Sequence, residues 1–365
     1  MSEAERQAFW RGKRVFLTGH TGFKGTWLAF VLHRWGALVH GFALSPEGDA
    51  NLFKAAERHG VFASSVIGDI RNPRAVDEAL SASDPEIVFH LAAQPLVRLS
   101  YRDPVATYAT NVMGTVHVLD AIRRLGSVKA VVAVTSDKCY ENNEWFWGYR
   151  ENEPMGGYDP YSNSKGCSEL VVSAFRKSYF KTAGVCGLGS GRAGNVIGGG
   201  DWSEDRLVPD LIRNILAGDE TPIRNPVAVR PWQHVLEPLS GYLSLAEELY
   251  REPSGDAADG WNFGPDASSE RSVLDVVSGV CSAWGDGASW RRDEGEHVHE
   301  AGYLKLDSSK ARRILKWEPV WGFDRTIEMT VSWYKAEAAR EDLVAFTTAQ
   351  ISQYFADLAA QKEKN

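Results

Sequence analysis

The sequence predicts an α/β fold, in which a doubly wound parallel sheet is followed by a smaller C-terminal lobe. Three observations predict it. Apolar runs of strand length alternate with helical segments through the first half of the chain, a glycine-rich turn joins the first run to the first helix, and the alternation weakens after Gly191 into stretches rich in Gly, Pro and Trp. Strands that alternate with crossover helices form parallel sheets.

The expected strands follow one another from the N-terminus. Their residue ranges are 14–19, 37–44, 64–69, 87–93, 130–136 and 184–190. A helix is expected between the first two strands, from about Gly22 to Trp35, and a last helical segment runs from about Phe323 to a charged tail. Ligands of such sheets bind beyond the carboxyl ends of the strands, which is where the motifs described below fall.

Composition and charge narrow the classes of function. The chain has 365 residues, 44% of them hydrophobic, so it can bury a full core and is long enough for two domains. Its net charge of −8 is spread along the sequence with both signs interleaved, which argues against nucleic acid or a membrane surface as a partner. The N-terminus is polar and no apolar run approaches the ~18 residues of a membrane span, so we expect a cytoplasmic protein.

The cysteines predict neither a disulfide framework nor a metal site. Cys139, Cys167, Cys186 and Cys281 are widely spaced, form no CxxC pair and have no histidines at ligand spacing around them. We therefore expect reduced thiols.

The turn after the first expected strand reads TGHTGFKG and places Gly19, Gly22 and Gly25 at the opening of a helix. A pyrophosphate needs a tight turn, a close backbone and free amides at a helix N-terminus. A strand-to-helix turn without a ligand has similar glycines, but the strand before and the helix after favour a dinucleotide. We therefore expect residues 1–190, with part of 230–260, to form a Rossmann-type dinucleotide-binding domain and residues 191–365 to form mainly a substrate-binding lobe.

The contacts to the adenosine end of a dinucleotide are less well marked. The second strand ends with Ser45 where an Asp or Glu would bond the ribose 2′-hydroxyl of NAD, and no Arg stands beside it for a 2′-phosphate. Lys24 and His20 lie in the glycine loop, so this position leaves NAD and NADP open. Asp69, at the end of the third strand, is a candidate for the adenine amine or, equally, a turn or helix-capping residue.

Three residues form a candidate proton-transfer group. Tyr161 and Lys165 lie four residues apart in YSNSK and share one face of the expected helix. A cation beside a phenol favours the phenolate and makes it a usable base. The pair alone is also typical of a protein surface, but the 130–136 strand ends in Ser136, which matches the hydroxyl partner of the short-chain dehydrogenase/reductase superfamily that these motifs resemble. The predicted chemistry is hydride transfer from a carbon whose oxygen these groups hold.

Together the motifs resemble the CDP-glucose 4,6-dehydratases, a branch of the extended short-chain dehydrogenase/reductase superfamily. The resemblance rests on GHTGFKGTWL, HLAAQPLVRLSY, TSDKCYEN, YSNSKGCSEL, RAGNVIGGGDW, RPWQHVLEPLSGY and YLKLDSSKA, which extend from residue 19 to beyond 311. It implies conversion of CDP-D-glucose to CDP-4-keto-6-deoxy-D-glucose and water, with NAD regenerated in each turnover, on the path to dideoxysugars of bacterial surface polysaccharide. The missing acid after the second strand departs from the usual superfamily pattern.

The resemblance also accounts for the two residues after Ser136. Loss of water needs a base for the C5 proton and an acid for the departing C6 hydroxyl, and it implies Asp137 as the acid and Lys138 as the base. Asp137 must then be held neutral, and the Lys138 amine must be neutralised by burial or by the neighbouring Lys165. The alternative is a helix-capping Asp beside a solvated Lys.

The remaining site residues are implied by the same resemblance. The expected cofactor-binding residues are Gly19, His20, Thr21, Gly22, Phe23, Lys24, Gly25, Asp69, Ile70, Leu91, Ala92, Ala93, Gln94, Tyr161 and Lys165. The expected substrate-binding residues are Asn195, Arg206, Arg230, Asn262, His299 and Tyr303. Each Arg suits a phosphate because its planar fork makes two bonds, although each is equally compatible with a surface ion pair.

Two other classes of protein share these motifs. The first is a sugar epimerase or simple dehydrogenase on the same scaffold, or a dehydratase of another nucleotide sugar, since a fold does not decide a function. The second is a catalytically silent dinucleotide-binding protein that senses redox state, against which the complete set of Ser136, Tyr161 and Lys165 argues.

Two helical segments, about 104–125 and 161–180, predict a homodimer. In the first, Val105, Tyr108, Val112, Val116 and Leu119 trace one apolar stripe and Ala106, Met113, Val118 and Ile122 trace another; in the second, the apolar residues are Leu170, Val171, Val172, Ala174 and Phe175. One stripe can face the sheet. The other needs a second partner, which we expect to be the same helix of another copy or, alternatively, the substrate lobe.

Overall fold

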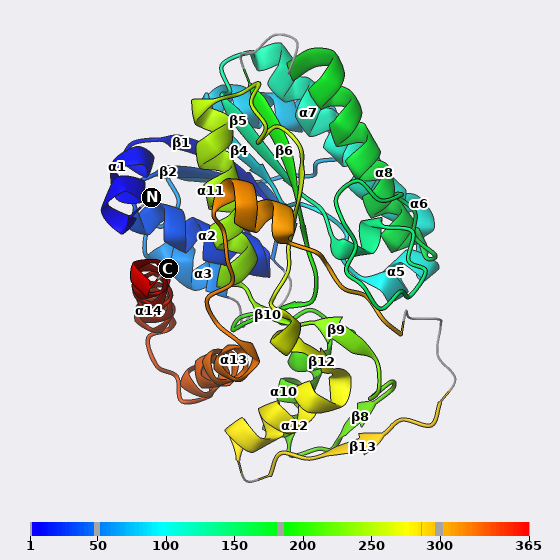
Figure 1. Ribbon diagram of the computed structural model, residues 1–365. Coiled ribbons are helices and arrows are strands. Elements are labelled where there is room, and N and C mark those ends of the chain that lie inside the picture. Colours follow the sequence, from blue (N-terminus) through cyan, green and yellow to red (C-terminus); the bar gives the residue numbers. More distant parts are fainter. Residues whose placement is uncertain (1, 47–51, 181–185, 286, 296–301, 365) are drawn as a thin grey trace.

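A seven-stranded parallel sheet forms the centre of the molecule. The computed structural model describes residues 2–46, 52–180, 186–285, 287–295 and 302–364 (Figure 1). The strand order is β11-β6-β5-β4-β1-β2-β3, and the sheet is doubly wound and parallel, as the sequence predicts. The strands are β1 (Arg14–Thr18), β2 (Leu38–Ala43), β3 (Ser64–Ile67), β4 (Ile87–His90), β5 (Ala130–Val134), β6 (Gly187–Ala193) and β11 (Gly260–Phe263).

Six of these strands were expected, and five lie within their predicted ranges. The sixth, β6, ends three residues later than predicted, because Gly191 to Ala193 still pair with β11. Residues 184 and 185 of the predicted run lie outside the described residues. The seventh strand, β11, was not expected.

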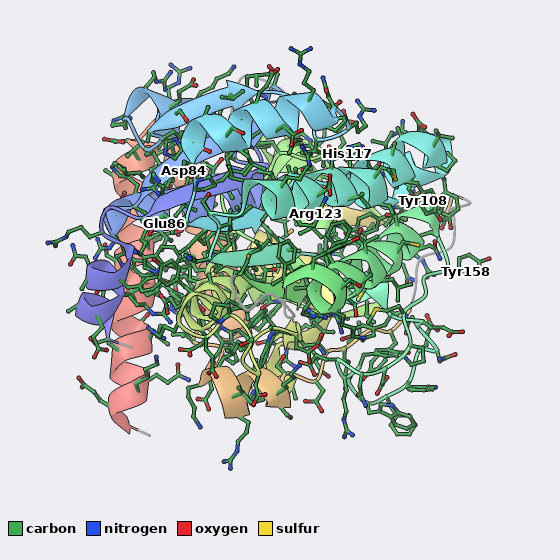
Figure 2. The ribbon with its side chains drawn as sticks, turned by 90° about the horizontal axis from the view of Figure 1, so that it is seen from above. Asp84, Glu86, Tyr108, His117, Arg123 and Tyr158 are labelled. Atoms are coloured by element: carbon green, nitrogen blue, oxygen red, sulfur yellow. The ribbon has the colours of Figure 1, made fainter. Side chains whose placement is uncertain are left out.

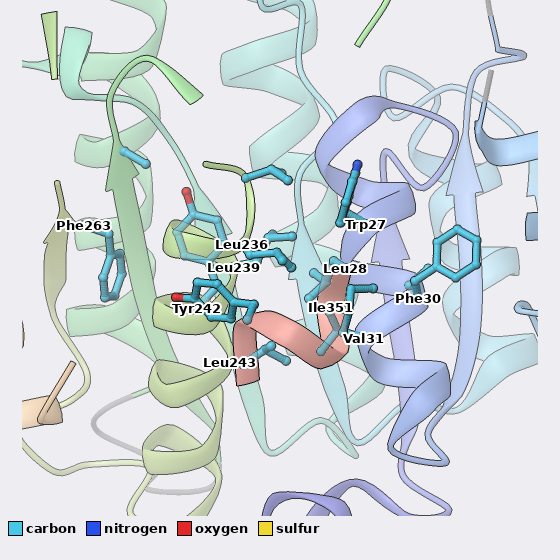
Figure 3. Packing of buried hydrophobic residues seen from close by; sticks show 14 of the residues in the cluster. Trp27, Leu28, Phe30, Val31, Leu236, Leu239, Tyr242, Leu243, Phe263 and Ile351 are labelled. Carbon is cyan, nitrogen blue, oxygen red and sulfur yellow. The ribbon is translucent and has the colours of Figure 1, made fainter. Parts of the chain in front are cut away.

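Helices cover both faces of the sheet. On one face lie α2 (Phe23–Arg34) and α11 (Leu236–Arg251), which share a hydrophobic cluster with the sheet (Figure 3). On the other lie α4 (Pro73–Ser83), α7 (Gly114–Leu125) and α8 (Pro160–Phe175). A short α5 (Val97–Arg102) and α6 (Pro104–Tyr108) precede α7, which follows a π-helical turn at Ala109–Met113; another π-helical turn at Arg176–Phe180 ends α8.

The apolar stripes of the second helical layer divide differently from the prediction. Val118, Leu119 and Ile122 are all buried against the sheet, so the buried face combines residues of both predicted stripes. Val105 and Met113 are 79% and 48% exposed, and Leu170 of α8 is 61% exposed. Figure 2 shows Tyr108, His117 and Arg123 along this layer, beside α8. No other part of the described chain covers the three apolar residues Val105, Met113 and Leu170.

A smaller lobe lies beyond the carboxyl edge of the sheet (Figure 1). Its elements are α10 (Leu207–Ala217), β8 (Thr221–Ile223), β9 (Val229–Pro231), β12 (Glu270–Ser272), α12 (Val273–Trp284) and β13 (Trp290–Arg292). β12 and β9 are antiparallel, β13 and β8 are parallel, and the short parallel pair β7 (Val196–Ile197) and β10 (Gln233–His234) leads into α11.

Segments at the two ends of the chain pack on the half of the molecule that holds the central sheet. α1 (Glu3–Trp10) docks through Trp10, whose Nε1 donates to Glu247 Oε1 at 2.8 Å. The predicted C-terminal segment is two helices, α13 (Phe323–Ala338) and α14 (Leu343–Lys364). Phe355 of α14 packs on Trp35 after α2, with ring centroids 4.8 Å apart, and α3 (Leu52–Arg58) lies beside α14. α14 therefore packs on the sheet domain, whereas α13 also packs on α12 (Val273–Trp284), which lies beyond the carboxyl edge of the sheet.

Candidate active site

A cavity of about 280 Å³ lies between the carboxyl edge of the sheet and the small lobe. The predicted Ser136, Asp137, Lys138 and Tyr161 line it from the sheet side, and Asn195, Arg206 and Arg230 line it from the lobe side. These seven residues come from segments up to 94 positions apart (230 − 136) and were expected in one site from sequence motifs alone. The structure brings them together.

The glycine loop between β1 and α2 has the shape of a phosphate cradle. Gly19 has φ +77°, and a Cβ there would lie 2.8 Å from the backbone nitrogen of Ala92. A Cβ on Gly25 would lie 2.1 Å from the carbonyl oxygen of Gly19, so both positions need glycine. The first turn of α2 begins at Phe23 after an extended Gly22, and its amides are available to an anion.

The other expected cofactor residues lie around this loop. Some of them are held there by hydrogen bonds of their backbone amides. Thr21 Oγ1 donates to the Leu44 carbonyl at 2.9 Å, and the amides of Leu91 and Ala92 donate to Thr18 Oγ1 at 3.1 Å. The His20 ring turns away from the loop into the protein, where it is buried and bonds Ser65 Oγ at 2.9 Å. Burial lowers the pKa of His20 to about 4, so the ring is neutral near pH 7.

At the adenosine end, Asp69 is engaged within its own turn. Its carboxylate accepts two bonds from the Arg71 guanidinium, at 2.8 and 2.6 Å, and one from the Arg71 amide. The Ile70 side chain packs in the core against Gly114, so it offers a ligand only its backbone. The Gln94 side chain bonds Leu96 and Thr107, and the half-buried Ala93 precedes it. The adenine contact of Asp69 stays a prediction. To make it, the Asp69 carboxylate would have to bond the adenine while it still pairs with Arg71.

Tyr161, Lys165 and Ser136 form the expected proton-transfer group. Tyr161 and Lys165 lie one turn apart near the start of α8 and are 8% and 6% exposed. Burial raises the pKa of Tyr161 to about 12, while a hydrogen bond with Ser136 and the charge of Arg206 oppose the rise. Burial also lowers the pKa of Lys165 to about 8, with Glu169 opposing. Arg206 therefore joins the groups that favour the phenolate.

Asp137 has the environment of a neutral acid. It is 2% exposed, and burial raises the pKa of its carboxyl group, opposed by Lys138, Ser136, Arg230 and Lys24. Ser136 Oγ donates to Asp137 Oδ1 at 2.9 Å, whereas Oδ2 has no hydrogen-bond partner among the described residues. A Cβ on Gly194 would lie 2.6 Å from Oδ2, so glycine there leaves room at this oxygen. The capping interpretation does not fit, because Ser136 rather than Asp137 caps the short 3₁₀ turn Asp137–Cys139.

Lys138 and Lys24 bring two amines to the same cavity. Lys138 Nζ lies 5.9 Å from the centroid of the Tyr161 ring. Lys24 projects from the first turn of α2, and burial, with Arg206 and Lys165 adding, lowers its pKa to about 7. The site therefore concentrates cations where a diphosphate could offset them.

The expected substrate residues divide into two groups. Arg206 Nη1 pairs with Asp201 Oδ2 at 2.7 Å, and the buried Arg230 donates to its own neighbour, the carbonyl of Val229, at 2.9 Å. Both line the cavity with Asn195. The Tyr303 carbonyl accepts from Asn142 Nδ2 at 3.0 Å, and Tyr303 is the parallel bridge partner of Val229, whose amide donates to the Gly302 carbonyl. His299 lies outside the described residues.

Asn262 does not line the cavity, and its assignment to the nucleotide site stays a prediction. It lies on β11, fully buried, where Nδ2 donates to the carbonyls of Tyr149 and Asp307 at 2.8 and 3.1 Å. Its Oδ1 accepts from the Tyr140 hydroxyl at 2.7 Å. Through these bonds the Asn262 side chain joins β11 to the segments that carry Tyr140, Tyr149 and Asp307. The sequence could not separate this role from ligand binding, because β11 itself was not expected.

A buried ion pair beneath the site was missed. Glu169, one turn after Lys165, pairs with Arg192 of β6 at 2.7 Å and also accepts from Thr135 and Ser190. Arg192 donates in turn to the Tyr140 hydroxyl at 2.7 Å. The repeat of polar residues at positions 161, 165 and 169 of one helix face is the signal that could have found Glu169.

Comparison with known proteins gives one family and several relatives. The family model described as GDP-mannose 4,6 dehydratase matches residues 16–330. The chain is 54% identical over 350 residues to the CDP-glucose 4,6-dehydratase of Salmonella typhimurium, covering 95% of this chain and 97% of that protein.

Solved structures of related fold have lower identity. A dTDP-glucose 4,6-dehydratase of Bacillus anthracis, solved in complex with NAD, matches with a TM-score of 0.75 at 22% identity, over 91% of this chain and all of that one. A UDP-glucose 4-epimerase of Thermotoga maritima, solved with UDP-glucose, matches with a TM-score of 0.74 at 22% identity, over 89% and 99%. These likenesses show the fold, which dehydratases and epimerases share.

Proposed function

Because this chain belongs to the GDP-mannose 4,6 dehydratase family, and within it to the CDP-glucose 4,6-dehydratases, we propose that it converts CDP-D-glucose to CDP-4-keto-6-deoxy-D-glucose and water. The observation that carries the proposal is the buried Asp137, whose open oxygen lies beside the Ser136 and Tyr161 pair in one cavity. An epimerase or simple dehydrogenase needs Ser136 and Tyr161 for oxidation, but it eliminates no water and so needs no neutral carboxylic acid as a proton donor.

The residues present fit NAD as the cofactor. Gly19 and Gly25 leave a cradle that a Cβ would fill, the amides of α2 open onto it, and the Lys24 amine adds positive charge. When bound, NAD takes the hydrogen from C4 of the sugar and returns it at C6. Lys165 would hold the nicotinamide ribose, and Asp69 with the backbone of Ile70 would hold the adenine.

In the oxidation half, Tyr161 removes the proton of the C4 hydroxyl. Ser136 bonds the phenol and fixes the sugar oxygen between the two groups. The phenol needs a nearby cation to act as a base, because its pKa stands at about 12: burial and the charge of Asp137 raise it, while the hydrogen bond with Ser136 and the charge of Arg206 lower it. Lys165 lies one turn away on the same face, and its positive charge would favour the phenolate further.

In the elimination half, Lys138 and Asp137 each move one proton. The C4 ketone acidifies the C5 hydrogen, which the Lys138 amine accepts as a proton. Asp137 donates its proton to the C6 hydroxyl, which leaves as water. Burial favours the protonated form of Asp137, and the free Oδ2 has space to reach the sugar.

One incubation tests this function. The purified protein with CDP-glucose should give a product lighter by one water, detected by mass spectrometry, while GDP-mannose and dTDP-glucose should react far more slowly. A C4 epimer of unchanged mass would instead make the chain an epimerase. Preferential dehydration of another nucleotide sugar would overturn the CDP-glucose assignment but not the reaction class.

We also propose a homodimer formed through α6, α7 and α8. Val105, Met113 and Leu170 are exposed on the side of these helices that faces away from the sheet, and a second copy would cover them. Light scattering at micromolar concentration should give twice 40.3 kDa, and Met113→Asp or Leu170→Asp should lower it to the monomer mass. Val172→Asp is not a suitable probe, because Val172 is fully buried in the core. A wild-type mass of 40.3 kDa would contradict the dimer.

For its compartment we propose the bacterial cytoplasm. All four cysteines are free thiols, which suits a reducing environment, and in the described residues no helix combines the length and apolar character that crossing a membrane requires. The product would serve a path to dideoxysugars of surface polysaccharide. Growth of a deletion strain with altered surface polysaccharide would support this placement, and unaltered polysaccharide would argue against it.

A further inference from the structure

Asp201 is a buried carboxylate at the rim of the cavity to which no role has been given so far. It follows three glycines in GGGDW and is 4% exposed. We propose that Asp201 is the positioning residue of the phosphate-binding arginine: it holds Arg206 in the cavity, and helix α13 holds the loop that carries Asp201. This inference rests on the proposed function, because Arg206 is assigned there to the diphosphate of the substrate.

The contacts of Asp201 divide its two oxygens between two tasks. Oδ1 accepts from the amide and hydroxyl of Ser203, at 3.2 and 2.8 Å, and so fixes the carboxylate within its own turn. Oδ2 accepts from Arg206 Nη1 at 2.7 Å. The Asp201 side chain is 5% exposed, whereas that of Arg206 is 31% exposed. The carboxylate of the pair is therefore fixed in the interior, and the guanidinium remains accessible from the cavity. A guanidinium held through one nitrogen keeps its other donors for an anion.

Neighbouring acids on the same segment do not have this geometry. Asp205 pairs with Arg98 at 3.2 Å and Asp210 pairs with Arg213, and both acidic side chains are about one-third exposed, at 30% and 33%. Asp201 alone of the three is held in the interior. The burial argues for a fixed orientation rather than a surface ion pair.

The C-terminal helices support this loop from behind. Tyr334 of α13 donates its hydroxyl to the Asp201 carbonyl at 2.6 Å. A Cβ on Gly199 would lie 2.0 Å from the Trp333 ring, and Trp27 of α2 donates to the Gly199 carbonyl at 2.8 Å. Trp333 bonds Thr347 of α14 at 2.9 Å. Because glycine has no side chain, the loop can lie close against α13. This contact fixes the position of the Asp201 backbone.

Arg206 reaches the reacting groups as well as the expected phosphates. Its charge lowers the pKa of both Tyr161 and Lys24, which places it among the cations that face the phenol. A misplaced Arg206 would therefore weaken substrate binding first and oxidation second. Asp201 also supplies a negative charge to a cavity that holds Lys24, Lys138 and Arg230.

Binding of CDP and of cytidine, measured by calorimetry on the full-length protein, tests the proposal without relying on turnover. Cytidine has the same base and ribose and lacks both phosphates. Asp201→Asn should weaken CDP binding about tenfold and leave cytidine within about twofold, because the lost orientation affects only the phosphate contacts. In turnover the same variant should raise KM more than it lowers kcat. Tyr334→Phe should weaken CDP binding less, by about threefold, and it serves as the second variant if Asp201→Asn does not fold.

A double-mutant cycle separates positioning from a structural role. Arg206→Ala should weaken CDP binding, and adding Asp201→Asn to it should weaken binding no further. Glu204→Gln removes an exposed acid from the same loop and is the matched control, expected to bind both ligands as the wild type does. Equal losses for CDP and cytidine, or independent losses in the double variant, would overturn the inference. If the wild-type protein binds CDP as predicted but does not dehydrate CDP-glucose, the proposed function fails while the role of Asp201 stands.

Discussion

Two carboxylate–arginine pairs with the same 2.7 Å separation border the active site, and they differ in what surrounds the arginine. In the pair Glu169–Arg192 the side chains are 3% and 5% exposed, and the remaining partners are protein atoms. In the pair Asp201–Arg206 the acid is as deeply buried, but the arginine is 31% exposed and faces the cavity. The first pair can only hold the fold, whereas the second can also hold a ligand.

The different exposure of the two arginines indicates which polar side chains of this molecule can take part in function. Buried polar side chains that bond protein atoms and do not line the cavity, such as Glu169, Arg192 and Asn262, join β6, β11 and α8 to the rest of the fold. Polar side chains with a face toward the cavity, such as Asp137, Tyr161 and Arg206, are available for chemistry. Variants of the first kind should cost stability and variants of the second kind should cost turnover or binding.

The largest effect is expected from Tyr161→Phe. Loss of the phenol removes the base for the C4 hydroxyl and leaves the ring, so turnover should be abolished while NAD and substrate bind within a few-fold. Steady-state rates and calorimetry measure the two properties separately. A variant that keeps more than a tenth of the wild-type rate would refute the assignment.

Asp137→Asn should come next and should separate the two halves of the reaction. C4 should still be oxidised, so the near-ultraviolet absorbance of the reduced cofactor should accumulate on the enzyme, while product forms ~10² to 10⁴ times more slowly. The melting temperature should be unchanged or higher, because a buried carboxyl group is replaced by a neutral amide. Normal dehydration by this variant would make Asp137 structural.

Arg192→Met tests whether the buried Glu169–Arg192 pair stabilises the fold. It leaves the buried Glu169 carboxylate without its ion-pair partner, which typically costs ~3–5 kcal/mol of unfolding free energy. Chemical denaturation should show this loss, and the folded fraction at low temperature should bind CDP normally. The double variant Glu169→Gln with Arg192→Met should recover much of the stability. Unchanged stability of the single variant would mean that the pair does not hold the fold.

A smaller effect is expected for the two cavity arginines. Arg206→Ala and Arg230→Ala should each raise the KM for CDP-glucose about tenfold, or ~1.4 kcal/mol, and lower kcat less, as for contacts made in both ground and transition states. Unchanged KM in both variants would show that the nucleotide site lies elsewhere.

The sequence predicted the sheet and the reacting groups better than it predicted the lobe. Strand ends and glycine turns are local signals, so the sequence placed Gly19 in a close glycine loop and Ser136 and Tyr161 in one site, where both of these line the cavity. β11, the roles of Asn262 and Asp201, and the division of the apolar stripes on α7 depend on which distant segment packs against them. An exposed Met113 and a buried Leu119 carry similar hydrophobicity in the sequence. Only the packing against the sheet distinguishes them.

The path of the C4 hydrogen tests the central claim most directly. CDP-glucose carrying deuterium at C4 should give a product that has lost one water and carries the deuterium at C6, as seen by NMR, because one bound cofactor takes the label and returns it within the same turnover. Deuterium that stays at C4 with no loss of water, or a dehydrated product that carries a hydrogen from solvent at C6 in place of the deuterium, would contradict the account.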